Sequence, residues 1–178
     1  MAIAYFAYGS NMSSRRLRQR LPGAKCTGLA RLTQHKLRFR KNDQGMSAKC
    51  DIELTGSVAD EVIGVLYDIS LEEKQLLDQI EGLGTGYDEK VVELRTDAGQ
   101  VVFAVTYCAI NIDENMIPYH WYKQHVLRGA IEHNLPPSYI DLIEAIPSKE
   151  DADDQRNLRE LDIYPGEPIT GRRYHSTE

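Results

Sequence analysis

The chain has 178 residues, of which 42% are hydrophobic, and a formal net charge of −6 at neutral pH, as expected for one soluble domain with or without a tail. The acidic balance argues against a general nucleic-acid binder, and no apolar stretch approaches the length that crosses a membrane. The N-terminus lacks the basic region and cleavage site of a signal peptide, so we expect a cytoplasmic protein without nucleic-acid or membrane partners.

The first predicted elements are a strand, a sharp turn and a helix. Residues 3–8 are apolar at odd and even positions, which predicts a central strand covered on both faces. Gly9 allows the backbone to turn, and residues 14–21 are compatible with a helix. Because a helix start leaves backbone N–H groups free, the Gly9-Ser10-Asn11 turn suits a carboxylate or a developing oxyanion. Such junctions are common, so the alternative is a satisfied turn without a function.

Several short strands are predicted next. Residues 36–40 alternate between apolar and polar, which indicates one solvated face, and 51–54 follows as another strand. Residues 61–69 are apolar on both faces and are expected to be interior. A glycine-containing turn joins 90–95 to 101–110 as a hairpin, and we expect its second strand to be the most buried in the chain.

Three further helices are predicted from their end signals. The segment 71–81 begins with a capping box of Ser70 and Glu73 and is followed by glycine. Two more helices are expected over 118–133, which starts at a proline, and over 138–145, which ends before a proline.

These elements predict an α+β fold. Many short strands without regular strand-helix alternation favour a small, mixed, largely antiparallel sheet that closes into a barrel-like form with packed helices. We expect one domain over residues 1–147 and a polar tail over 148–178, where acidic residues replace large apolar ones. Four apolar side chains leave open whether part of this tail is anchored to the domain: Leu158, Leu161, Ile163 and Tyr164.

Three segments carry a family resemblance. Phe6-Ala7-Tyr8-Gly9-Ser10-Asn11-Met12 resembles the Tyr-Gly-Ser-Asn signature of the gamma-glutamylcyclotransferase-like family. Leu77-Asp78-Gln79-Ile80-Glu81-Gly82, with Tyr87 downstream, is similar to the family's segment around its catalytic Glu. Tyr122 with Gly129-Ala130, Asn134-Leu135-Pro136 and Tyr139 is similar to the family's C-terminal helix region. The matches occur in family order over residues 2–146, and they imply a barrel-like sheet and a gamma-glutamyl ligand.

The resemblance implies that Glu81 transfers protons. This residue lies one helical turn after Leu77, on a helix whose Leu76, Leu77 and Ile80 are expected to face the core. A carboxylate there is partly shielded from water, which favours its protonated form and suits it to act as a general acid or base. Without the resemblance, a solvated Glu at a helix end is the ordinary interpretation.

The implied reaction is an intramolecular cyclisation without a cofactor. The free α-amino group of a gamma-glutamyl compound attacks its own γ-carbonyl, which yields 5-oxoproline and a released amino acid or amine. The protein then has to hold the folded substrate, move protons and stabilise an oxyanion. Asn11 after Tyr-Gly-Ser is similar to the branch that acts on gamma-glutamyl amino acids or amines, whereas the glutathione-specific branch tends to carry Leu there.

Six residues are predicted to bind this small-molecule substrate, through turn amides or pocket phenols: Tyr8, Gly9, Ser10, Asn11, Tyr87 and Tyr139. Tyr107 and Tyr122 rank below Tyr87 and Tyr139, and a core tyrosine with one satisfied hydroxyl is an equally good interpretation of Tyr107. The alternative function is a non-catalytic module that binds a gamma-glutamyl or other small carboxylate ligand. Glu81 favours the enzyme, because a carboxylate repels an anionic ligand.

Other reactive side chains carry weaker signals. The histidines lack the spacing of a helical zinc site and the three cysteines are widely separated, so neither a metal nor a disulfide framework is predicted. Ser10 lacks the flanking pattern of a hydrolase nucleophile. Four arginines on the first helix form either a solvated face or a guide for the anionic substrate: Arg15, Arg16, Arg18 and Arg20.

Overall fold

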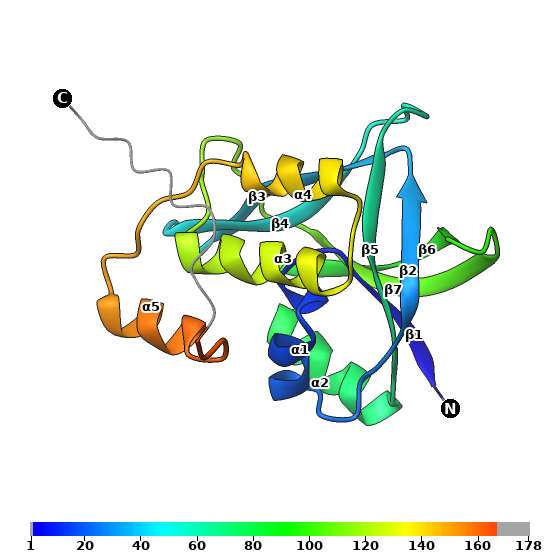
Figure 1. Cartoon of the computed structure of the whole chain (residues 1–178), viewed down its shortest axis with the longest axis horizontal. Coiled ribbons are helices and arrows are strands. Elements are labelled where there is room, and N and C mark those ends of the chain that lie inside the picture. Colours follow the sequence, from blue (N-terminus) through cyan, green and yellow to red (C-terminus); the bar gives the residue numbers. More distant parts are fainter. Residues whose placement is uncertain (1, 167–178) are drawn as a thin grey trace.

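A computed structural model describes residues 2–166 and shows a closed five-stranded barrel with a separate two-stranded sheet beside it (Figure 1). The barrel order is β1-β5-β2-β6-β7. Its strands are β1 (Ile3–Ala7), β2 (Lys25–Thr33), β5 (Glu61–Ile69), β6 (Tyr87–Thr96) and β7 (Val101–Ala109). The second sheet pairs β3 (His35–Asp43) with β4 (Ser47–Leu54). Only the β1–β7 pair is parallel among these described strands, so the predicted α+β fold with a mixed, largely antiparallel barrel is confirmed.

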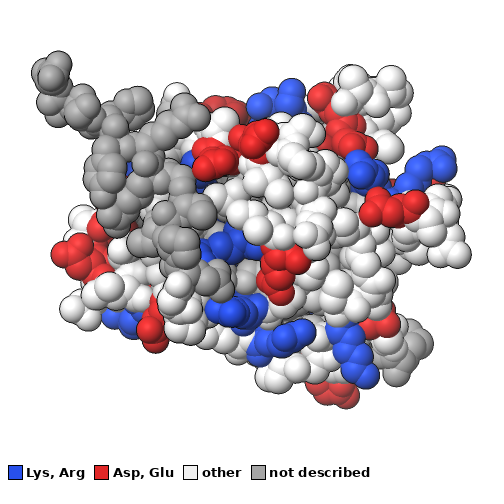
Figure 2. Space-filling model, in the orientation of Figure 1, with Lys and Arg blue, Asp and Glu red and all other residues white. Residues whose placement is uncertain are grey.

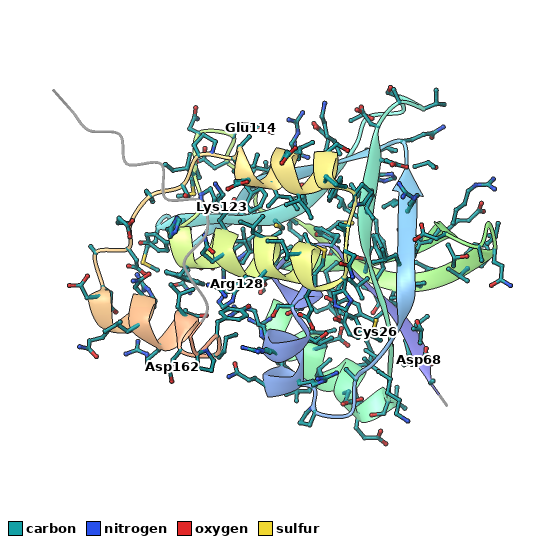
Figure 3. All side chains as sticks on the ribbon, in the orientation of Figure 1. Cys26, Asp68, Glu114, Lys123, Arg128 and Asp162 are labelled. Carbon is teal, nitrogen blue, oxygen red and sulfur yellow. The ribbon has the colours of Figure 1, made fainter. Side chains whose placement is uncertain are left out.

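The helices pack around the barrel. They are the 3-10 turn η1 (Ser10–Met12), α1 (Ser14–Arg20), α2 (Leu71–Glu81), α3 (His120–Glu132), α4 (Pro137–Glu144) and α5 (Asp154–Leu161). The long helix α3 contacts η1, α4 and α5, and so ties the first turn to the C-terminal half (Figure 1). Lys123, labelled on α3 in Figure 3, donates hydrogen bonds of 2.6 Å to the carbonyl oxygens of Glu144 and Ile146 at the end of α4. In the described part of the chain, no helix is long and apolar enough to cross a membrane.

The predicted central position of the first strand is confirmed. β1 pairs with β5 on one edge and with β7 on the other, and Phe6 and Ala7 are buried.

Acidic and basic side chains are interspersed over the face seen in Figure 2. Neither sign of charge forms a continuous patch over the coloured part of this face.

The hairpin of β6 and β7 is confirmed, but the prediction that β7 is the most buried strand is wrong. Val101 is 48% exposed and Phe103 is 64% exposed. β5 instead is buried at every position except its first and eighth. The reason is that β5 is covered on its outer side, where the amide of Ile63 donates a 3.2 Å hydrogen bond to the hydroxyl of Tyr139 on α4, whereas the first half of β7 faces outward.

The strand β2 was not predicted. Its first three residues are exposed and only Ala30 and Leu32 are buried, so it lacks a clear two-residue pattern. Pairing makes it a strand, because β2 lies between β5 and β6 and bonds to both. The register shifts between Cys26 and Gly28, and Gly28 adopts a φ of 144°, which favours glycine.

The helix α2 confirms its predicted ends but corrects its predicted buried face. Ser70 and Glu73 form the capping box, and Gly82 ends the helix in the left-handed conformation. Leu77 is fully buried, but Leu76 and Ile80 are about two-fifths exposed. The apolar stripe of α2 is narrower than predicted, because Lys74 shares the buried face of the helix and forms ion pairs there with Asp78 and Glu89.

The described part of the predicted tail is anchored by Tyr164. Its hydroxyl donates a 2.9 Å hydrogen bond to Ser13 Oγ and lies 2.9 Å from Nδ1 of the buried His125. Glu160 on α5 accepts a 2.6 Å hydrogen bond from Arg16 and lies 3.1 Å from Nε2 of His125. Leu158 is 63% exposed and does not contribute to this anchor. The predicted tail residues 167–178 lie outside the described residues.

The buried His125 predicts an acid-sensitive fold. Burial lowers the pKa of His125 from 6.5 to about 4, although Glu160 opposes the shift. The unfolded chain then binds a proton between pH 6.5 and 4 that the folded chain does not bind, so stability falls as the pH falls through this window. We expect a loss of up to about 3 kcal/mol in the free energy of unfolding. Urea unfolding of wild type and of His125→Gln at several pH values checks this, because the variant should show a flatter profile. Equal pH slopes in both proteins would contradict it.

Candidate functional site

Glu81 lies where two cavities meet. A recess of about 30 Å³ is enclosed by tyrosines and by the Gly9-Ser10-Asn11 turn, and a cleft of about 370 Å³ opens beside it. Four residues line both cavities: Ser10, Glu81, Tyr87 and Tyr122. The cleft is within the size range of small-molecule sites, about 300–1,000 Å³.

The turn Gly9-Ser10-Asn11, called the signature turn below, forms one side of the site. Its hydrogen bonds run from Met12 N to Gly9 O at 3.0 Å and from Ser13 N to Ser10 O at 3.3 Å, so this segment is a 3-10 turn and not the first turn of the α-helix. The N–H groups of Ser10 and Asn11 have no acceptor within the turn, because they lie at its start. The α-helix itself begins at residue 14.

Two side chains from two other elements, η1 and α1, meet Glu81 at the end of α2. Asn11 Nδ2 donates a 3.0 Å hydrogen bond to Glu81 Oε1, and Arg20 donates one of 3.4 Å to the same oxygen. Arg20 also donates a 3.0 Å hydrogen bond to Asn11 Oδ1. The side chain of Glu81 is 17% exposed. Its carboxylate is therefore held in one orientation and still reaches the cleft.

Tyr5, on strand β1 of the barrel, contacts the Asn11 side chain that bonds to Glu81. Its hydroxyl accepts a 3.0 Å hydrogen bond from Asn11 Nδ2, so the amide of Asn11 bridges Tyr5 and Glu81. Burial, and then the nearby negative charge of Glu81, raise the pKa of Tyr5 well above its usual value. Burial also lowers the pKa of the Arg20 guanidinium, with a further lowering from Arg16, while Glu81 opposes both effects.

Tyrosines form the other walls of the recess. Tyr8 donates a 2.5 Å hydrogen bond to the carbonyl of Tyr107, and Tyr87 donates one of 2.8 Å to the carbonyl of Cys50. Tyr122 accepts a 3.0 Å hydrogen bond from the amide of Cys50. Burial raises the pKa of Tyr8, Tyr87 and Tyr122 well above the usual value, so these phenols stay neutral. They shape the recess and add no negative charge to it.

The structure brings together most of the predicted site residues. Those that line the recess are Tyr8, Gly9, Ser10, Asn11, Glu81 and Tyr87. Tyr139 does not join them, because it lines a separate hollow among α4, β3 and β5 and its hydroxyl accepts a hydrogen bond from the Ile63 amide. Its place in the sequence did not reveal on which side of the barrel α4 packs. Tyr107 and Tyr122, which were ranked lower, both line the recess.

The four arginines of the first helix divide into two pairs. Arg16 and Arg20 line the cleft, whereas Arg15 and Arg18 are exposed, so only the first pair lies where an anionic substrate would meet it. The four-residue spacing of Arg16 and Arg20, on the side of the buried Leu17, is the sequence signal for this division. Tyr5 and Lys41 were missed, since a tyrosine in an apolar strand and a lysine in a charged strand carry no distinctive pattern.

Comparisons with known proteins identify the family of this chain. The model of the AIG2-like family matches residues 61–143. The gamma-glutamylcyclotransferase of Homo sapiens is 33% identical over 150 residues, which covers 82% of this chain and 79% of that protein. This chain belongs to the AIG2-like gamma-glutamylcyclotransferase family. The Mus musculus gamma-glutamylcyclotransferase is 32% identical over the same shares of the two chains.

Solved structures show the same fold for this family member. A gamma-glutamyl cyclotransferase superposes with a TM-score of 0.78 at 27% identity, covering 90% of this chain and 99% of that one. An uncharacterized protein from Homo sapiens superposes with a TM-score of 0.77 at 29% identity, covering 89% and 98%.

Proposed function

We propose that this family member cyclises the gamma-glutamyl group of a gamma-glutamyl amino acid or amine to 5-oxoproline and releases the amino acid or amine. The observation that carries the proposal is the position of Glu81. Its carboxylate lies 3.0 Å from the Asn11 amide of the signature turn and lines both the recess and the cleft. A single carboxylate at this junction can reach the two nitrogens between which a proton has to move.

In this proposal the recess receives the reacting end of the substrate. Its volume of about 30 Å³ admits one small polar group. The γ-carbonyl oxygen suits this space, because the backbone amides of the turn and the hydroxyl of Tyr122, which accepts from Cys50 N and keeps its own hydrogen, offer donors without negative charge. The remainder of the substrate lies in the cleft, where Arg16 and Arg20 favour its carboxylates.

The α-nitrogen starts as an ammonium group and ends as the lactam N–H, so it loses two protons. Glu81 accepts them one at a time and passes each to the leaving nitrogen, which departs as an amine and ends as an ammonium group. The α-amino nitrogen forms a bond to the γ-carbon, and the bond from this carbon to the leaving nitrogen breaks. Since both nitrogens belong to one molecule, holding the substrate folded removes much of the entropic barrier. Asn11 and Arg20 keep the Glu81 carboxylate oriented toward this exchange.

The proposal is tested by incubating the purified protein with gamma-glutamyl amino acids, gamma-glutamyl amines and glutathione. Mass spectrometry for 5-oxoproline and for the released partner is the readout, and we expect both in equal amounts from at least one compound. If ligands bind in the cleft but no compound of the panel yields 5-oxoproline, the protein is the non-catalytic binding module and the proposed reaction is wrong.

A further inference from the structure

The hairpin of β3 and β4 forms the far wall of the cleft that contains Glu81. Lys41 and Lys49 line this wall, and the two residues lie directly opposite each other in the strand register. Like charges in directly opposed positions destabilise a pair of strands. Negative charge between the two ammonium groups would offset this repulsion and stabilise the cavity wall.

Only part of that negative charge comes from the described cleft lining. Asp43 lies 3.4 Å from Lys41 Nζ and 3.0 Å from Lys49 Nζ, so two ammonium groups share one carboxylate. Although burial opposes the shift, Lys49 and Lys41 hold the pKa of Asp43 below its usual value, so this carboxylate is already ionised at neutral pH. Glu81, the other acid of the lining, is paired with Arg20. The corner formed by Lys41, Asp43 and Lys49 keeps an excess of one positive charge.

This basic corner adjoins the reacting end of the site. The ammonium group of Lys41 lies over the ring of Tyr87, 5.4 Å from its centre, and Tyr87 lines the recess as well as the cleft. The side chain of Lys41 is only 11% exposed. A cation that is buried to this extent is expensive to leave incompletely compensated, and a ligand anion lowers that cost.

We propose that Lys41, with Lys49 beside it, binds the carboxylate of the amino acid that leaves, and so selects gamma-glutamyl amino acids over gamma-glutamyl amines. This inference rests on the proposed function, because it assigns the leaving end of the same substrate. The carboxylate of the leaving amino acid and the ammonium group of Lys41 keep their charges throughout the reaction. The leaving nitrogen gains a proton as its bond to the γ-carbon breaks. Lys41 is accordingly a specificity-determining residue with no part in the proton transfer.

Two ligands that differ by one carboxylate test the selection. Gamma-glutamylalanine and gamma-glutamylethylamine share every other group, and calorimetry with the Glu81→Gln protein measures their binding without turnover. We expect the alanine compound to bind about tenfold more tightly or better, because hydrogen bonds between two charged groups are the stronger kind. Equal affinities, or binding of neither compound at millimolar concentration, would overturn the inference.

A second substitution, added to the Glu81→Gln protein, tests whether the basic corner causes the preference for the alanine compound. Lys41→Met is expected to weaken the alanine compound about tenfold and to leave the ethylamine compound unchanged, whereas Lys41→Arg keeps most of the preference. Lys36→Met is the matched control, since Lys36 lies on the same strand, is about half exposed and pairs with Asp60 outside the cleft. If Lys41→Met weakens both compounds equally, its role is structural. Lys49→Met should reduce the preference in the same direction, and provides the test if Lys41→Met does not fold.

Turnover separates this inference from the proposed function. If the Glu81→Gln protein prefers the alanine compound and unmodified protein forms no 5-oxoproline from any compound of the panel, the basic corner is confirmed and the proposed reaction fails. If unmodified protein converts both compounds with equal kcat/KM and the affinities are equal, the reaction is confirmed and the selection fails.

Discussion

Glu81→Gln is expected to lower kcat on the best gamma-glutamyl substrate by about a hundredfold or more, which is the usual contribution of a positioned proton carrier. The carboxamide cannot take up the proton of the α-ammonium group. Its carbonyl oxygen can still accept the hydrogen bond that Asn11 donates to Oε1, so the geometry of the recess should persist. Initial rates of 5-oxoproline formation, measured with protein whose unfolding transition is unchanged, check this result.

Glu72→Gln is the matched control for this substitution. Glu72 lies in the first turn of the same helix, is exposed and does not line the recess or the cleft. It should retain wild-type kcat. A folded Glu81→Gln protein with nearly full turnover would end the assignment of Glu81 as the proton carrier, whatever the control shows.

Gly129→Ala is expected to lower the free energy of unfolding by about 1–3 kcal/mol, as overpacking of a close contact does, and to reduce activity as well. A methyl group at this position of α3 would lie 2.5 Å from the backbone nitrogen of Ser13 and 2.6 Å from Cβ of Met12. Both atoms belong to the segment that carries Ser10 and Asn11, so the helix or the signature turn has to move. Urea unfolding and the kcat/KM of the purified variant measure the two effects.

Gly23→Ala provides the comparison for this prediction. A methyl group there meets only the carboxylate end of the Glu73 side chain, at 2.8 Å, which can move away. We expect a smaller loss of stability and unchanged activity. If Gly129→Ala is as stable and as active as Gly23→Ala, the close packing of α3 against the turn does not position the site.

The elements predicted correctly are those with strong local signals. Ser70 and Glu73 marked the start of α2, and Gly82 marked its end, because capping groups act within one helical turn. The doubly apolar segment before Gly9 marked a strand with neighbours on both edges. The site residues proposed on these elements, from Tyr8 to Asn11 and at Glu81, rest on the family signature that they carry, and the structure places them around one recess.

The errors concern contacts across the molecule. Leu76 and Ile80 share a helical face with Leu77, but periodicity does not tell how wide a stripe the barrel covers. The strand β2 has few buried residues of its own and depends on its two neighbours. Tyr139 follows the family pattern, yet the packing of α4 on β5 places it in a different hollow.

The sequence by itself determined the local framework: the capped helix α2, the hairpin of β6 and β7, the signature turn after β1, and the identity of Glu81 as the candidate acid or base. Only the tertiary structure decided that Asn11 and Arg20 bond to this carboxylate, that Tyr5 bonds to Asn11, and that Lys41 lines the same cleft. Caps and turns depend on neighbours within a few residues, so a single sequence contains them. Contacts between η1, α1, α2 and β3 depend on barrel closure and side-chain packing, which involve the whole chain at once.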